Sequence, residues 1–201
     1  MSGIGGVIMH PRRGEAHAVD EANARPMGLF SLIREDWVTN WKDWTRPGFR
    51  ALVMYRLGVW RMGVKPRLLR WPLSLLYRFM HRWVRNRYGI ELHYTAKIGR
   101  RLLIAHQGAI VIHEGARIGD DCILRQGVTL GAAGNYSVDR APVLGDRVSV
   151  GAGAMILGGV TVGDGATVGP NAVVLGDVPA GAIATAAPAR IIRPAAAKEA
   201  A

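Results

Sequence analysis

One stretch decides the fold: residues 144–178 read LGDRVSVGAGAMILGGVTVGDGATVGPNAVVLGDV. Every sixth position is aliphatic, and the residue two positions before each aliphatic residue has a small or short side chain. This period matches neither the helical repeat of about 3.6 residues nor the strand repeat of about two. We therefore expect a parallel β-helix, a coil of short strands joined by tight corners. The aliphatic positions are Leu144, Val150, Ile156, Val162, Val168 and Val174; the short ones are Val148, Ala154, Val160, Ala166 and Ala172.

The same frame extends upstream, which places the β-helix at residues 90–192. The frame slips by two residues after Ile104, and residues 131–140 have no hexad pattern, so we expect a loop there. Cys122 occupies an inward small position, which predicts a buried thiol rather than a nucleophile. The upstream aliphatic positions are Leu92, Ile98, Ile104, Ile112, Ile118, Leu124 and Leu130.

Residues 27–89 have helical patterns and form a predicted α-helical arm. Helices are expected from near Leu29, with three tryptophans on one face, from Pro47 as a first-turn proline, and over residues 67–86. The third helix is basic and aromatic. Its apolar face either packs on neighbouring helices or subunits, or contacts a membrane surface or an acidic polymer. Residues 1–26 are expected to be disordered and residues 193–201 to form a flexible tail. The three tryptophans are Trp37, Trp41 and Trp44, and the apolar residues of the third helix are Trp71, Leu75, Leu76, Phe79 and Trp83.

The formal net charge of +11 is concentrated in this arm. Between Thr45 and Ile90 there are eleven basic residues and no acidic one. No nucleic-acid-reading motif accompanies the charge, so nucleic acid is not an expected partner. The single cysteine excludes a disulfide within the chain, and the first 27 residues lack an apolar core of signal-peptide length. We expect a cytoplasmic protein whose basic arm allows a peripheral position at the inner membrane surface.

Four ordered motifs carry a resemblance to a known family: RPGFRAL at 46–52, GIELH at 89–93, QGVTLG at 126–131 and PARII at 188–192. Together with the hexads, they resemble the left-handed β-helix acyltransferases, and among those the serine acetyltransferases, over residues 30 to 192. The resemblance implies a left-handed β-helix, acetyl-CoA as the acyl donor and a homotrimer.

The resemblance also implies a catalytic base. Transfer from a thioester to a hydroxyl needs a group that accepts the hydroxyl proton, and histidine suits this near neutral pH. The catalytic histidine of the family falls on His106, where the hexad frame slips. The acid that the family pairs with it falls on Glu91, which would orient the imidazole. The alternatives are an ordinary corner residue for His106 and a solvated side chain for Glu91.

Substrate binding is expected at Arg140 and Gln126, but two positions depart from the family. An acid precedes the catalytic histidine in the family, and a second histidine lies in the loop; here these positions hold Ala105 and Ala141. An ammonium group removed from water needs an anionic partner. We therefore expect a sugar or polysaccharide-precursor hydroxyl as the acceptor, with serine O-acetylation as the alternative.

Coenzyme A binding is expected at small residues that let the pantetheine approach the backbone, and at an arginine for a phosphate. Two other functions remain open. Three histidines invite comparison with zinc carbonic anhydrases of the same fold, although no metal is expected; a non-catalytic scaffold would also tolerate the two alanines. The expected coenzyme A residues are Gly131, Ala152, Gly153, Gly158 and Arg190, and the three histidines are His93, His106 and His113.

Overall fold

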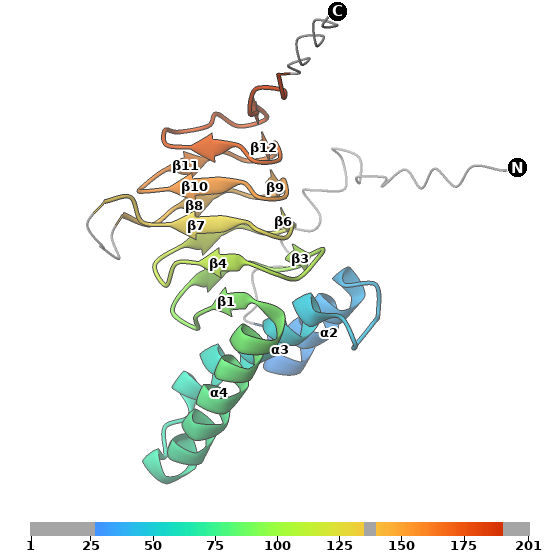
Figure 1. The fold of residues 1–201 in the computed structure, drawn as a ribbon. Coiled ribbons are helices and arrows are strands. Elements are labelled where there is room, and N and C mark those ends of the chain that lie inside the picture. Colours follow the sequence, from blue (N-terminus) through green and yellow to red (C-terminus); the bar gives the residue numbers. More distant parts are fainter. Residues whose placement is uncertain (1–26, 135–139, 191–201) are drawn as a thin grey trace, which may run out of the picture.

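The computed structural model describes residues 27–134 and 140–190. A helical arm leads into a coil of parallel strands, and β12 lies near the end of the coil opposite the arm (Figure 1). The parallel β-helix expected from the hexads is confirmed. The disorder predicted for residues 1–26 and the tail predicted for 193–201 fall outside the described residues, as do residues 135–139 of the predicted loop.

Three parallel sheets form the walls of the coil, and each strand pairs with the strand one coil away. Sheet A contains β1 (Ile90–Leu92), β4 (Ile110–Ile112), β7 (Thr129–Gly131), β10 (Met155–Leu157) and β13 (Val173–Val174). Sheet B contains β2 (Lys97–Ile98), β5 (Arg117–Ile118), β8 (Val143–Leu144) and β11 (Thr161–Val162). Sheet C contains β3 (Leu103–Ile104), β6 (Ile123–Leu124), β9 (Ser149–Val150), β12 (Thr167–Val168) and β14 (Ile183–Ala184).

The hexad positions build the core because they lie in register from coil to coil. Ile118 pairs with Leu144, and Leu130 with Ile156, and all four are at most 3% exposed. Cys122 is fully buried beside them, as its frame position predicts. Side chains along a strand alternate between the two faces, so a slip by one residue would turn the aliphatic set outward.

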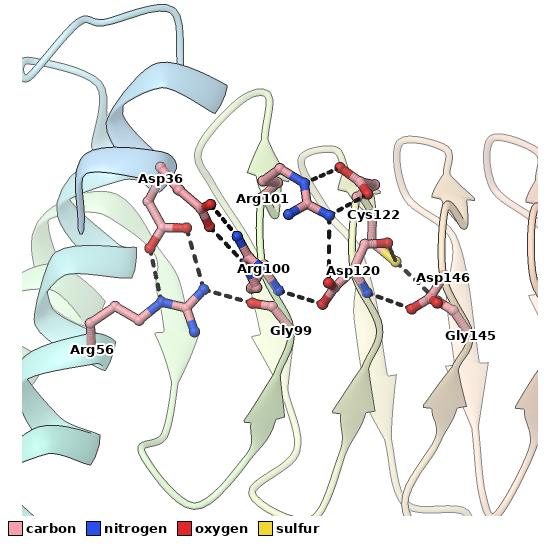
Figure 2. A network of polar contacts seen from close by, with 11 residues as sticks. Asp36, Arg56, Gly99, Arg100, Arg101, Asp120, Cys122, Gly145 and Asp146 are labelled. Atoms are coloured by element: carbon pink, nitrogen blue, oxygen red, sulfur yellow. Dashed lines mark hydrogen bonds and ion pairs between the residues drawn. The ribbon is translucent and has the colours of Figure 1, made fainter. Parts of the chain in front are cut away.

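A ladder of aspartates runs along one corner of the coil and pairs backbone groups that the strands leave free. The Arg100 amide donates to Asp120 at 2.7 Å, and the Asp120 amide donates to Asp146 at 2.7 Å (Figure 2). The Asp146 amide continues the ladder and donates to Asp164 at 2.9 Å. Each of these aspartates follows a glycine, because a side chain at that position would collide with the next coil. A Cβ on Gly119 would lie 2.6 Å from the carbonyl of the next coil.

Two coils are longer than the others. Ile112 pairs with Leu130, 18 residues later, which is three hexads. Leu92 pairs with Ile112, 20 residues later, and Leu130 pairs with Ile156, 26 residues later. The two extra residues lie in the corner that contains His106, and the eight extra residues lie in the chain between β7 and β8, of which residues 135–139 are outside the described structure.

The arm consists of α2 (Leu29–Thr39), α3 (Pro47–Trp60), the short 3-10 helix η1 (Arg61–Gly63) and α4 (Arg67–Tyr88). Pro47 occupies the first turn of α3, as predicted. Gly89 ends α4 in a left-handed conformation (φ 62°) and turns the chain into β1. No helix of residues 27–134 or 140–190 has the length and apolar character needed to cross a membrane.

The arm is fastened to the first coil by buried polar contacts (Figure 2). Arg56 forms an ion pair with Asp36 at 2.9 Å and donates to the Gly99 carbonyl at 2.6 Å. The Tyr55 hydroxyl donates to the Ala96 carbonyl at 2.8 Å. These contacts cover the end of the coil, where unpaired strand edges would otherwise face solvent.

One expectation about the arm is wrong. The three tryptophans do not share a helix face, because α2 ends at Thr39 and Trp41 adopts a left-handed conformation in the following turn (φ 60°). Of the partners expected for the apolar face of α4, neighbouring helices of residues 27–134 and 140–190 leave Phe79 70% exposed, so another subunit or a membrane surface stays open. Helix α4 buries the opposite face, with Tyr77 and Val84, against the rest of the protein.

Candidate active site

Four of the predicted site residues meet at one corner of the coil. Strands β3, β6 and β9 lie in register, so the residues two positions beyond each strand occupy the same corner in successive coils. These residues are His106, Gln126 and Ala152. The Gly153 amide donates to the Gln126 carbonyl at 2.9 Å and joins the second coil to the third. We call this edge, where sheet C passes to sheet A, the His106 corner.

His106 is exposed at this corner, in the turn that is two residues longer than its counterparts. Gly108 and Ala109 both adopt positive φ (105° and 50°), which reverses the chain immediately after the histidine. The Gly127 amide donates to the Gly108 carbonyl at 2.9 Å. The extra residues therefore form an ordered turn, fixed to the next coil, that carries the imidazole on the outside of the coil.

The arm supports the segment that leads to His106, and the sequence did not predict this role. Arg46 donates to the carbonyl of Ala105 at 3.5 Å, and Asn40 donates to the carbonyl of Leu102 at 3.4 Å. A Cβ on Gly48 would overlap the carbonyl oxygen of Ile104. The RPGF motif was the available signal, because an arginine and a glycine beside a first-turn proline indicate close contact with another backbone.

Glu91 lies at the middle of β1 on the outward face of sheet A, opposite Val111 of the next strand. Among the described residues, no hydrogen bond or ion pair joins it to His106. Its negative charge acts instead on two other histidines, His81 of α4 and His93 after β1: burial lowers the pKa of both, and Glu91 opposes both shifts. The pairing of Glu91 with His106 therefore remains a prediction.

The other predicted residues lie at a second corner, where sheet A passes to sheet B; we call it the Gly131 corner. The Gly158 amide donates to the Gly131 carbonyl at 2.8 Å. Arg140 lies beside them, with its Cα 3.7 Å from where a Cβ on Gly159 would be. The strands of sheet A separate the two corners, so a single chain does not bring Arg140 to His106. Arg190 is exposed beyond β14 and stays a prediction for coenzyme A binding.

The three-histidine zinc site receives no support from the fold. His93 and His113 follow paired strands and lie at the Gly131 corner, whereas His106 lies at the other corner. Within residues 27–134 and 140–190, no group of three histidine, cysteine or carboxylate side chains is placed to hold a metal. Cys122 is not a nucleophile either, because burial raises the pKa of its thiol to about 12.

Comparison with known proteins identifies the family. Residues 141–176 match the model of the bacterial transferase hexapeptide, six repeats. A serine acetyltransferase of Helicobacter pylori is 44% identical over 116 residues, covering 58% of this chain and 64% of that protein. One from Synechococcus elongatus is 42% identical over 120 residues, covering 58% and 45%. The matched region thus spans roughly half to two thirds of these relatives.

Solved structures agree over more of the chain. A truncated serine acetyltransferase apoenzyme has a TM-score of 0.67 and 31% identity, covering 89% of this chain and 74% of its own. The Brucella abortus serine acetyltransferase in complex with coenzyme A has a TM-score of 0.68 and 27% identity, covering 88% and 71%. The chain therefore belongs to the hexapeptide-repeat, left-handed β-helix acyltransferases, in the family that includes the serine acetyltransferases.

Proposed function

We propose that this protein transfers an acetyl group from acetyl-CoA to the hydroxyl of L-serine. The observation that carries the proposal is an exposed imidazole, that of His106, on an ordered corner in a chain whose relatives are serine acetyltransferases. Histidine is the side chain best suited to accept and return a proton at neutral pH.

In the proposed reaction, His106 accepts the proton of the acceptor hydroxyl as its oxygen attacks the acetyl carbonyl carbon. The new C–O bond forms and the C–S bond breaks. The imidazolium then returns the proton to the sulfur, and coenzyme A leaves as the thiol. Glu91 is proposed to orient the imidazole and stabilise its charged form, as the acid does in hydrolytic triads.

A homotrimer would complete the site. The outward face of sheet A has a row of exposed apolar side chains, Val111, Met155 and Val173, that are 41–59% exposed in the single chain. Packing this face on a neighbouring subunit would bury the row and bring the Gly131 corner of one subunit toward the His106 corner of the next. We propose that the acceptor and coenzyme A bind in this cleft.

The coenzyme A residues divide between the two sides of that cleft. Ala152 and Gly153 would lie beside His106, whereas Gly131 and Gly158 would lie across from it. Small side chains on both sides would let the pantetheine reach backbone amides. The neighbour from Brucella abortus was solved with coenzyme A, which supports the same donor here. Arg190 is proposed to bind a phosphate.

Serine has more support than a sugar, because the relatives and the solved structures named above are serine acetyltransferases. A sugar hydroxyl remains a second candidate on one observation: Ala105 and Ala141 stand where the resemblance predicts an acid and a histidine. Ala141 is only 7% exposed and packs into the core, so a histidine would need rearrangement there. Arg140 still offers a positive charge for the serine carboxylate.

The test is the release of free thiol from acetyl-CoA by the full chain, measured with L-serine and with a panel of hexoses and hexosamines. We expect release with L-serine and none above background with the His106→Ala variant. Turnover of a sugar without turnover of serine would keep the transferase and replace the acceptor. No release with any hydroxyl would overturn the function and favour a non-catalytic scaffold.

A further inference from the structure

The solvent-facing side of α4 is apolar from Leu68 to Trp83, although the helix already buries its opposite side. Side chains four, three or seven residues apart lie on one helix face. Here that pattern selects exposed residues, which we call the outer stripe. Pro72 lies within it. The outer stripe consists of Leu68 (90% exposed), Leu75 (45%), Leu76 (53%), Phe79 (70%) and Trp83 (45%).

The opposite face of α4 is the one that packs against the rest of the chain. Tyr77 and Val84 are buried, and a Cβ on Gly58 of α3 would overlap the Tyr77 ring, so the two helices are in close contact. Within residues 27–134 and 140–190 the side chains of the outer stripe remain 45–90% exposed, although the Tyr88 ring lies edge-on against Trp83. Apolar patches of this size mark an interaction surface for a protein or a membrane.

Arginines flank the outer stripe on one side. Arg78, Arg82 and Arg85 line a hollow of about 220 Å³ together with His81 and His93. Arg82 also lines a second hollow of about 360 Å³, shared with Phe79, Trp83, Asn86 and Arg87. The chain from residue 45 to 90 contains eleven basic residues and no acid. The hollows therefore offer clustered positive charge beside aromatic rings.

The positive charge beside the outer stripe distinguishes between two possible partners, a second copy of α4 and a membrane surface. A second α4 would bring the arginine rows of both copies together with no carboxylate on either helix to pair with them. An anionic lipid surface complements the same rows and receives the apolar side chains between its headgroups. We propose that α4 docks on an anionic membrane surface, with the outer stripe inserted and the flanking arginines bound to lipid phosphates.

The position of α4 in the molecule suits this contact. The arm projects beyond the end of the coil at which β1 lies, with α4 along it (Figure 1). At the tip, where α3 turns into α4, Trp60 and Met62 are also exposed, at 46% and 48%. Aromatic side chains prefer the headgroup region of a bilayer.

The test is flotation of the full chain with phosphatidylcholine vesicles that contain or lack phosphatidylglycerol. We expect binding that requires phosphatidylglycerol and weakens with salt. The Arg78→Glu/Arg82→Glu variant should bind at least about 25-fold more weakly, because each basic residue near an anionic surface contributes roughly five-fold. The Leu75→Ser/Phe79→Ser variant should lose about ten-fold or more through reduced apolar burial.

Two control variants match these changes on other surfaces: Arg34→Glu on α2 and Ile183→Ser on sheet C, where the side chain is 73% exposed. Both should bind as the unchanged protein does, and all four variants should keep the same thermal unfolding midpoint. Vesicle binding that ignores phosphatidylglycerol, or that survives both α4 variants, overturns the proposal. The proposal is also overturned if the unchanged protein does not bind vesicles and the particle mass of the α4 variants is half that of the unchanged protein. The outer stripe would then be an interface between copies of the chain.

Discussion

At the scale of single residues, the account depends on the imidazole of His106. Its replacement by alanine should lower kcat by about 10²–10⁴, the usual contribution of a general base, while acetyl-CoA binding stays unchanged. Steady-state kinetics and a coenzyme A titration measure the two quantities. His81→Ala on α4 is the matched control and should retain kcat. Near-full activity of His106→Ala would assign the base to another group.

The alanine before the base belongs to the same scale. Ala105 is half-buried beside His106, and an aspartate there would place an anion near the ammonium of serine. We expect Ala105→Asp to raise kcat/KM for L-serine by about ten-fold, since a hydrogen bond to a charged group contributes roughly 1.5–3 kcal/mol. Kinetics with L-serine and with a neutral alcohol separate this effect from a general change in rate. An equal change for both acceptors would contradict it.

At the scale of elements, the contact between α3 and β3 positions the His106 corner. Gly48→Ala would push the two apart, because the added Cβ would overlap the Ile104 carbonyl. Such overpacking costs about 1–3 kcal/mol, and we expect both a lower unfolding midpoint and a lower kcat. Gly63→Ala is the matched control, since a Cβ there meets nothing within 4 Å. Thermal unfolding and kinetics on both variants check this; equal behaviour of the two would remove the arm from the mechanism.

At the same scale, some features of the helices and strands were predictable from the sequence and others were not. Strand positions such as Ile118 and Leu144 were predictable, because a closed coil permits only one burial pattern per hexad. The slip of the six-residue repeat after Ile104 also predicted an altered turn at His106. The contacts of Asn40 and Arg46 with that segment were not predictable, since they join backbone groups some 60 residues apart along the chain. Periodicity identified α4 as amphipathic but could not show which face the rest of the arm would cover.

At the scale of the whole molecule, the proposed site would need more than one chain. The two corners with predicted site residues lie on opposite sides of sheet A, and Glu91 lies between them on its outward face. Symmetric packing of that face would explain why one chain carries both halves of a site without joining them. Sequence alone located both corners but could not show that sheet A separates them.

Light scattering should therefore return three times the chain mass of 21.7 kDa at micromolar concentration. Met155→Glu should shift the mass toward the single chain, because it places a charge in the apolar row of sheet A. Ile183→Glu, an equally large change on sheet C, should leave the mass unaltered. A monomeric unchanged protein would remove the inter-subunit cleft from the proposal.

The identity of the acetylated product decides whether this chain O-acetylates serine. The full chain is incubated with acetyl-CoA and L-serine, and the amino acid is analysed by mass spectrometry, with His106→Ala in parallel. We expect serine heavier by one acetyl group, formed by the unchanged protein and nearly absent with the variant. Unmodified serine in both samples, with the thioester intact, would contradict it.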